Sequence, residues 1–103
     1  MLRVLAVALA AFAFVGARGV WSQDQALVAA GAEIYQAKCS ECHGPRMVST
    51  GAAFDLRELR ADDLPRFNKS VMEGLNQMPS WAGVLGPQEL DQLWAYVRSR
   101  AYQ

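Results

Sequence analysis

The sequence predicts a small all-α domain, and three observations support this fold class. The chain has 103 residues, of which 52% are apolar, and this length suffices for at most one domain. After an apolar N-terminal run, apolar residues recur at helical spacing in three segments, and no segment shows the alternation typical of a strand. Loops rich in glycine, proline and polar residues separate these segments. We therefore expect three main helices with short helical turns between them.

The N-terminal run is interpreted as a secretory signal peptide. Arg3 provides a positive start, Val4–Val15 is unbroken apolar sequence, and small residues follow. The run is shorter than the ~20 apolar residues that span a bilayer, and Arg18 interrupts its extension. An uncleaved membrane anchor is the alternative interpretation.

Two cleavage sites fit this segment, one after Ala17 and one after Ser22. The second is preferred because Gln23-Asp24 then begins a helix. We expect residues 1–22 to be removed on export to the periplasm. Residues 23–103 would then form one domain, with no stable insertion into the membrane after cleavage.

The first predicted helix runs from about Asp24 to Lys38, with Asp24 as its N-cap. Its apolar face is formed by five residues at helical spacing, Leu27, Ala30, Gly31, Ile34 and Tyr35.

The second helix is predicted to start after Asp62 as N-cap, to hold Pro65 in its first turn, and to stop at Gly74. Its apolar stripe consists of Leu64, Phe67, Val71 and Leu75. Asp55–Arg60 is expected to be another short helical turn.

The last helix is predicted to begin at Gly86-Pro87 and to end near Arg98–Arg100, where positive charge suits a helix C-terminus. Its apolar stripe consists of Leu90, Leu93, Trp94 and Val97.

The segments Gly44–Phe54 and Asn76–Leu85 are predicted to be loops. Both are long for so small a domain, and long ordered loops usually have a functional reason. A side-chain core of this size supplies only ~3–5 kcal/mol, so we expect a disulfide, metal or cofactor to stabilise the domain.

Charge and cysteine content exclude several classes of protein. Ten basic residues balance 10 acidic ones, so the chain lacks the positive surface that nucleic-acid binding needs. Two cysteines and one histidine are too few for a zinc site of four Cys/His ligands, and a multi-disulfide scaffold is excluded as well.

Residues 39–43, Cys-Ser-Glu-Cys-His, form a C-x-x-C-H sequence, which is typical of the covalent attachment of a c-type haem. Two thiols three positions apart at a helix end, Cys39 and Cys42, can each form a thioether with a haem vinyl group. The imidazole of His43, the single histidine, is then carried under the iron. The alternatives are a strained local disulfide or a redox-active pair as in thioredoxin-like proteins, whose βαβ pattern is absent here.

The chain resembles single-haem class I cytochromes c over nearly all of residues 23–103. The shared features are Gly31 and Tyr35, CSECHG at residues 39–44, Gly74-x-x-x-Met78-Pro79, and Leu93-Trp94-Ala95-Tyr96. The resemblance implies the class I cytochrome c fold around one covalently bound haem. It also implies that the first and last helices cross at right angles, with Gly31 against Tyr96.

The sixth iron ligand is expected to be one of the methionines after the signal peptide. A thioether sulfur and a histidine form an axial pair that raises the reduction potential of haem. Met78 is preferred because Pro79 biases it to extended backbone, from which its side chain can project. Met47 is too close to His43 to reach the opposite haem face and is expected to be a loop contact. Met72 has the spacing of a core residue, and Met72 or an open site is the alternative.

Arg57 and Trp81 are candidate partners of the haem propionates. A guanidinium suits bidentate binding of a carboxylate, and an indole N–H can donate to one. The alternatives are a solvated arginine and a tryptophan that only packs in the core.

Within the cytochromes, the sequence is similar to the haem c domain of quinohaemoprotein alcohol dehydrogenases, which use pyrroloquinoline quinone (PQQ). That group commonly has proline before Asp-Leu-Arg, and the proline carbonyl orients the axial histidine. Here the position is Phe54, which still offers a backbone carbonyl. The resemblance implies a partner dehydrogenase.

We expect an electron-transfer protein rather than an enzyme, with iron cycling between the ferric and ferrous states while both axial ligands stay bound. Its redox partners would be a dehydrogenase donor and a cytochrome or oxidase acceptor of a respiratory chain. They would dock near Met47, Val48 and Met78 through a small, transient interface. The alternative is a haem sensor or small peroxidase with an open sixth position, although the chain has no second histidine for distal acid–base catalysis.

Overall fold

The computed structural model describes residues 18–101, with side chains from residue 24 onward. The apolar run Val4–Val15 lies outside the described residues, so the signal peptide stays a prediction. Within residues 18–101, no helix combines the length and the apolar character needed to cross a membrane.

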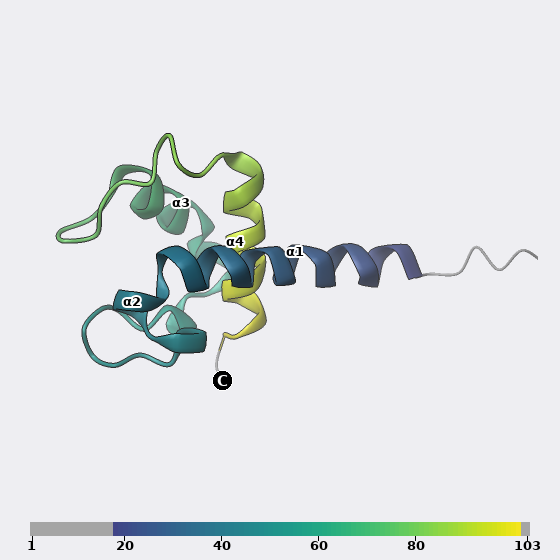
Figure 1. Cartoon of the computed structure of the whole chain (residues 1–103), viewed down its shortest axis with the longest axis horizontal. Helices are drawn as coiled ribbons and strands as arrows, with labels where there is room; N and C mark the ends of the chain where they lie inside the picture. The colour runs from purple at the N-terminus through teal and green to yellow at the C-terminus, as the bar shows by residue number, and fades with distance from the viewer. Residues whose placement is uncertain (1–17, 102–103) are drawn as a thin grey trace, which may run out of the picture.

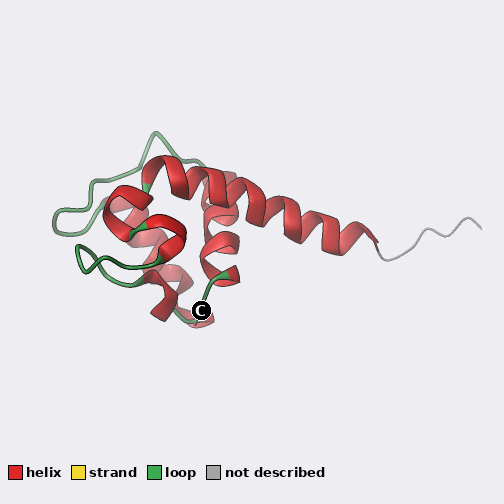
Figure 2. Ribbon diagram, turned by 60° about the horizontal axis from the view of Figure 1, so that its bottom comes forward, coloured by secondary structure: helices red, strands yellow, loops and turns green. Residues whose placement is uncertain are grey.

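Three main helices and several short helical turns make up the described chain (Figure 1, Figure 2). The main helices are α1 (Arg18–Lys38), α3 (Leu64–Glu73) and α4 (Pro87–Ser99). The short elements are α2 (Ser40–His43) and the 3-10 turns η1 (Pro45–Met47), η2 (Leu56–Glu58) and η3 (Ala61–Asp63). Residues 18–101 contain no strand, and the all-α prediction is confirmed.

Most of the predicted helix boundaries agree with the structure, but the start of the first helix does not. α1 ends at Lys38, α3 is followed by Gly74 with φ of 79°, and α4 begins at Pro87. α1 begins at Arg18, so Asp24 lies inside the helix and is not its N-cap. The capping preference of one aspartate is about 1 kcal/mol, and it does not stop a helix whose neighbouring residues on both sides can continue it.

The N-cap of α3 differs by one residue from the prediction. Asp63, not Asp62, occupies the N-cap position. The Asp63 side chain makes no capping hydrogen bond to α3. Both aspartates lie in η3, where the Asp63 carboxylate accepts a hydrogen bond of 2.8 Å from the backbone N–H of Arg60 and Asp62 pairs with the Arg60 guanidinium at 3.6 Å. The sequence does not distinguish two adjacent aspartates as candidates for the N-cap. The path of the backbone decides which of them occupies that position.

α1 and α4 cross at Gly31, and this crossing is the most extensive helix contact in the described chain (Figure 1). A Cβ atom on Gly31 would overlap the backbone carbonyl of Gln92 and would lie 2.8 Å from the Cβ of Tyr96. Glycine therefore permits an approach of the two backbones that any side chain would prevent. The expected pairing of Gly31 with Tyr96 is present in the structure.

Gly31→Ala is expected to destabilise the haem-loaded protein by about 2–4 kcal/mol, because the added methyl group must push the two backbones apart. Denaturant unfolding of the holoprotein measures this change. Ala29→Val adds more volume at an exposed position of the same helix and is expected to cost less than about 1 kcal/mol. Equal effects of the two substitutions would show that the crossing tolerates a side chain.

The core forms where α3 and the loops pack against the crossing of α1 and α4. Its buried residues are Tyr35, Met47, Leu59, Phe67, Val71, Leu85, Leu90, Leu93, Tyr96 and Val97. Two of the predicted stripe residues are exposed, Leu27 at 36% and Leu75 at 54%. Leu75 follows Gly74, where the backbone leaves the helix, so the helical spacing no longer fixes its direction.

Candidate haem site

The C-x-x-C-H sequence lies at the end of α1 and in the single turn α2. The backbone N–H of Cys39 donates to the carbonyl of Tyr35 at 2.8 Å, and the N–H of His43 donates to the carbonyl of Cys39 at 3.0 Å. α1 ends at Lys38, Cys39 is the N-cap of α2, and the rest of the motif forms that single turn. Because residues three and four positions apart share a helix face, Cys39, Cys42 and His43 lie on one side of the turn.

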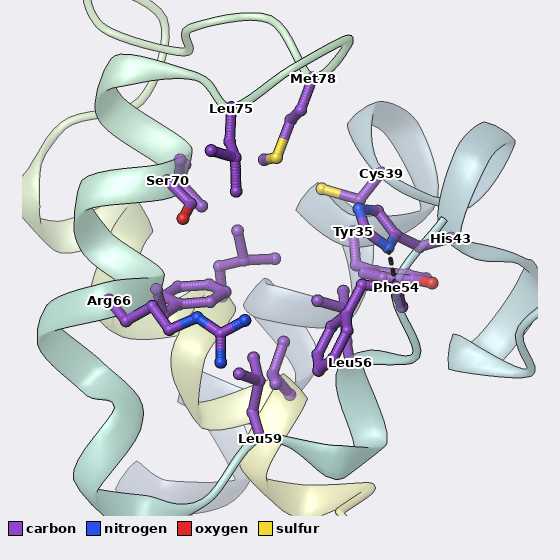
Figure 3. Close-up of a pocket in the computed structure, with 14 residues that line it drawn as sticks. Tyr35, Cys39, His43, Phe54, Leu56, Leu59, Arg66, Ser70, Leu75 and Met78 are labelled. Carbon is purple, nitrogen blue, oxygen red and sulfur yellow. Dashed lines mark hydrogen bonds between the residues drawn. The ribbon is translucent and has the colours of Figure 1, made fainter. Parts of the chain in front are cut away.

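The imidazole of His43 is held by the backbone of a distant loop. Its Nδ1 lies 3.0 Å from the carbonyl oxygen of Phe54 (Figure 3). A carbonyl can only accept a hydrogen bond, so this contact places the proton on Nδ1 and leaves the Nε2 lone pair for a metal. Phe54 thus provides the backbone carbonyl that was expected at this position.

The turn that follows His43 is anchored to the core by Tyr35. The Tyr35 hydroxyl donates a hydrogen bond of 2.6 Å to the carbonyl of Gly44, and Gly44 has φ of 93°. Burial is the main cause that raises the pKa of Tyr35 to about 12, so the hydroxyl remains a donor at neutral pH. Met47 at the end of this turn is only 1% exposed.

Residues 74–86, which connect α3 to α4 and are called the Met78 loop, fold back onto α3. Leu75 and Met78 exchange two backbone hydrogen bonds of 3.1 and 2.9 Å, and the N–H of Trp81 donates to the carbonyl of Val71 at 2.9 Å. A Cβ on Gly74 would lie 2.8 Å from the carbonyl oxygen of Met78, so this position also requires glycine. These contacts fix the backbone position from which the Met78 side chain extends.

Two adjoining cavities lie between the C-x-x-C-H turn and the Met78 loop. The inner cavity has a volume of about 100 Å³ and is lined mainly by apolar side chains, and the outer cavity has a volume of about 450 Å³ and opens beside Cys42. Five residues line both cavities: Cys39, His43, Phe54, Leu75 and Met78. The lining offers imidazole, thioether and thiol groups, which suit haem iron and haem vinyl groups.

Met78 is the one methionine of the described chain that lines these cavities. Met72 packs against the core and Met47 is buried in it. Figure 3 shows the Met78 side chain entering the inner cavity from the loop above Leu75, with His43 on a different wall.

The two expected propionate partners lie away from the inner cavity. The Arg57 guanidinium forms a two-point contact with Asp55, at 3.0 and 2.9 Å, and this contact lowers the pKa of the Asp55 carboxyl. Arg57 lines neither cavity, and Trp81 lines the outer cavity only, where the Lys38 ammonium lies 5.7 Å from its ring centroid. Their contact with haem propionates stays a prediction.

Two residues of the inner cavity, Arg66 and Ser70, were not expected from the sequence. Both lie on α3, and their four-residue spacing places them on one helix face. This spacing is visible in the sequence, but it does not reveal that the face borders a cavity. Met47 was expected at the docking surface and is buried instead, whereas its neighbour Val48 is 53% exposed.

The Cys39 thiol does not have the environment of a reactive cysteine in a thiol–disulfide exchange site. Burial raises the pKa of the Cys39 thiol to about 11, against a smaller lowering by Lys38. Redox-active cysteines have a lowered pKa, because the thiolate is the attacking species. The structure therefore argues against the thioredoxin-like alternative.

Comparisons with known proteins agree with this geometry. Residues 26–97 match the family described as cytochrome c oxidase, cbb3-type, subunit III. The quinohemoprotein alcohol dehydrogenases ADH-IIG and ADH IIB of Pseudomonas putida are each 37% identical to this chain, over 79% and 74% of it. The matches span only 12% and 11% of those two proteins.

A second group of relatives has a length close to that of the matched segment. Cytochrome c6 of Limnospira maxima is 32% identical over 72% of this chain and 93% of its own length. No solved structure gave a match. The match to a haem-protein family and the similarity to a whole electron-transfer cytochrome identify the chemistry of Cys39 and Cys42. The chain therefore belongs to the cytochrome c family, a family of haem-based electron-transfer proteins, and carries haem c attached covalently through thioethers.

Proposed function

We propose that this chain is a periplasmic electron carrier in which His43 and Met78 are the axial ligands of haem c. Haem c supplies the one-electron ferric/ferrous couple when bound. The observation that carries the proposal is the set of five residues that line both cavities. Apart from Cys39, the two shared side chains with a ligating atom are His43 and Met78.

The protein positions these two ligands by different means. The Phe54 carbonyl orients His43 and makes its imidazole a better donor to iron. The hydrogen-bonded turn between Leu75 and Met78 holds the backbone of Met78 and thereby limits the positions that its thioether can take. Apolar side chains around both ligands keep water out, which favours the less charged ferrous state and a higher potential.

The place of Met78 argues against the open-site alternative. A sensor or small peroxidase needs a sixth position without a protein ligand, and a peroxidase also needs distal acid–base groups. The inner cavity is lined mainly by apolar groups and carries no carboxylate, and the one imidazole on its wall, His43, is proposed as an axial ligand.

Partners are proposed to dock at the outer cavity. This cavity is lined by exposed, uncharged residues such as Ala52, Gln77 and Pro79, together with a single charged side chain, Lys38. A small, nearly uncharged contact suits the transient encounters of redox proteins and gives little electrostatic steering. The similarity to quinohemoprotein alcohol dehydrogenases favours a PQQ-dependent dehydrogenase as electron donor, with a respiratory cytochrome or oxidase as acceptor.

Stopped-flow reduction of the purified holoprotein by a PQQ-dependent alcohol dehydrogenase tests this function. We expect haem reduction that depends on the alcohol substrate and changes less than about 3-fold between low and physiological ionic strength. The ferric protein should be low-spin, and the ferrous protein should not bind carbon monoxide. High-spin ferric iron with rapid carbon monoxide binding would instead establish the sensor alternative.

Export is tested on the same preparation by N-terminal sequencing of the periplasmic product. Removal of residues 1–22 leaves Gln23 as the first residue, and cleavage at the other expected site leaves Arg18. A haem-stained product that retains Met1 in the membrane fraction would contradict the signal peptide.

A further inference from the structure

Arg66, an exposed residue of α3, is the one arginine or lysine on the wall of the inner cavity, and no carboxylate lines this cavity. Its guanidinium carbon lies 5.3 Å from the centroid of the Phe54 ring. Within residues 24–101, no carboxylate forms an ion pair with it. A cation beside an apolar cavity, without an acidic partner from the described chain, is suited to an anionic group of the molecule that fills the cavity.

Arg66 lies across the inner cavity from Cys39, so a porphyrin attached through Cys39 would carry its carboxylates on the Arg66 side. The thioethers form on the former vinyl groups along one edge of the macrocycle, and the two propionates leave from the opposite edge. Cys42 lines the outer cavity but not the inner one, and Arg66 lines the inner cavity but not the outer one. Figure 3 shows Cys39 and Arg66 on opposite sides of the inner cavity.

Ser70 adds a second polar group to the same wall. It follows Arg66 by one turn of α3, and its side chain also borders the inner cavity (Figure 3). A hydroxyl can donate a hydrogen bond to a carboxylate that the guanidinium pairs with. Lys38 and Trp81 lie instead with the cysteines at the outer cavity.

We propose that Arg66, assisted by Ser70, binds a haem propionate, a role that the sequence had suggested for Arg57. The inference rests on the haem placement of the proposed function. Pairing with a cation lowers the cost of holding a carboxylate beside an apolar cavity. The guanidinium charge also offsets the negative charge of the propionate, which would otherwise favour the ferric state of the iron.

The test uses purified holoproteins that carry Arg66→Gln, Arg66→Lys or Ser70→Ala. Resonance Raman spectroscopy reports the bending mode of the haem propionates, and a redox titration gives the midpoint potential. We expect Arg66→Gln to shift the propionate mode and to lower the potential, and Arg66→Lys to restore part of both. Ser70→Ala should produce a smaller shift of the mode in the same direction.

Three substitutions of other cations serve as matched controls. Lys69→Gln removes a charge from an exposed position of the same helix, outside both cavities. Lys38→Gln and Arg57→Gln remove the other candidate partners. All three are expected to leave the propionate mode unchanged, and a shift in Lys38→Gln or Arg57→Gln without one in Arg66→Gln overturns the inference.

The spectrum of the ferric protein separates this inference from the proposed ligation. If the methionine-to-iron charge-transfer band is present in every variant and Arg66→Gln leaves the propionate mode unchanged, the Arg66 contact is refuted while Met78 ligation stands. If the band is missing in the parent protein, the Met78 ligation fails. If Arg66→Gln does not accumulate, an unchanged propionate mode in both Arg66→Lys and Ser70→Ala refutes the contact.

Discussion

Replacing Cys39 and Cys42 together with alanine is expected to abolish covalent haem and to leave the chain without a stable helical fold. The inner cavity is bordered by the core residues Tyr35, Phe67 and Leu93, so the haem forms part of the interior. A side-chain core of this size supplies only ~3–5 kcal/mol, and an unfilled cavity between its helices lowers that stability further. The expected loss is therefore the whole stability of the domain.

Haem staining on a denaturing gel measures the covalent haem, and far-ultraviolet circular dichroism measures the helical content. Glu41→Ala is a suitable control, because this exposed residue lies inside the same motif and leaves both cysteines and His43 in place. We expect the control to retain haem, helical content and cooperative unfolding. A colourless double variant with full helical content and a cooperative unfolding transition would contradict the role of haem as part of the core.

Local patterns predicted the parts of this protein whose geometry is fixed by the neighbouring sequence. The motif at residues 39–43 forces two thiols and an imidazole onto one turn, whatever the remaining fold. The spacing of apolar residues in α3 and α4 likewise identified the faces that carry Phe67 and Leu93 into the core. The close approach of the two helices at Gly31 was predicted from the family resemblance alone. The sequence around a glycine inside a helix does not show which residue packs against it.

The features that the sequence did not predict depend on the direction of a side chain across the fold. The contact of Arg57 with Asp55, two residues away, was not expected from the sequence, and a propionate contact of Arg57 stays a prediction. Arg66 faces the cavity because α3 packs there, and no spacing in the sequence shows this orientation. Met47 is buried because the turn after Gly44 adopts positive φ at two residues that are not glycine, an uncommon backbone that residue types did not indicate.

Met78→Ala is expected to convert the proposed electron carrier into a haem protein with an open sixth position. Of the described methionines, Met78 is the one on the cavity wall, so no other thioether can take its place. The reduction potential should fall by on the order of 0.1 V or more, within the ~0.8 V range that axial ligands span. The methionine-to-iron charge-transfer band should vanish, and the ferrous protein should bind carbon monoxide.

Met72→Ala is the matched control because it removes the same thioether from a partly buried position in the core. It is expected to reduce stability by about 2–3 kcal/mol, through loss of packing, and to leave the potential and the charge-transfer band unchanged. The two variants therefore separate packing from ligation: a core methionine changes the unfolding transition, whereas an axial methionine changes the spectrum and the potential. Loss of the band in Met72→Ala, with the band retained in Met78→Ala, would assign the sixth ligand to Met72.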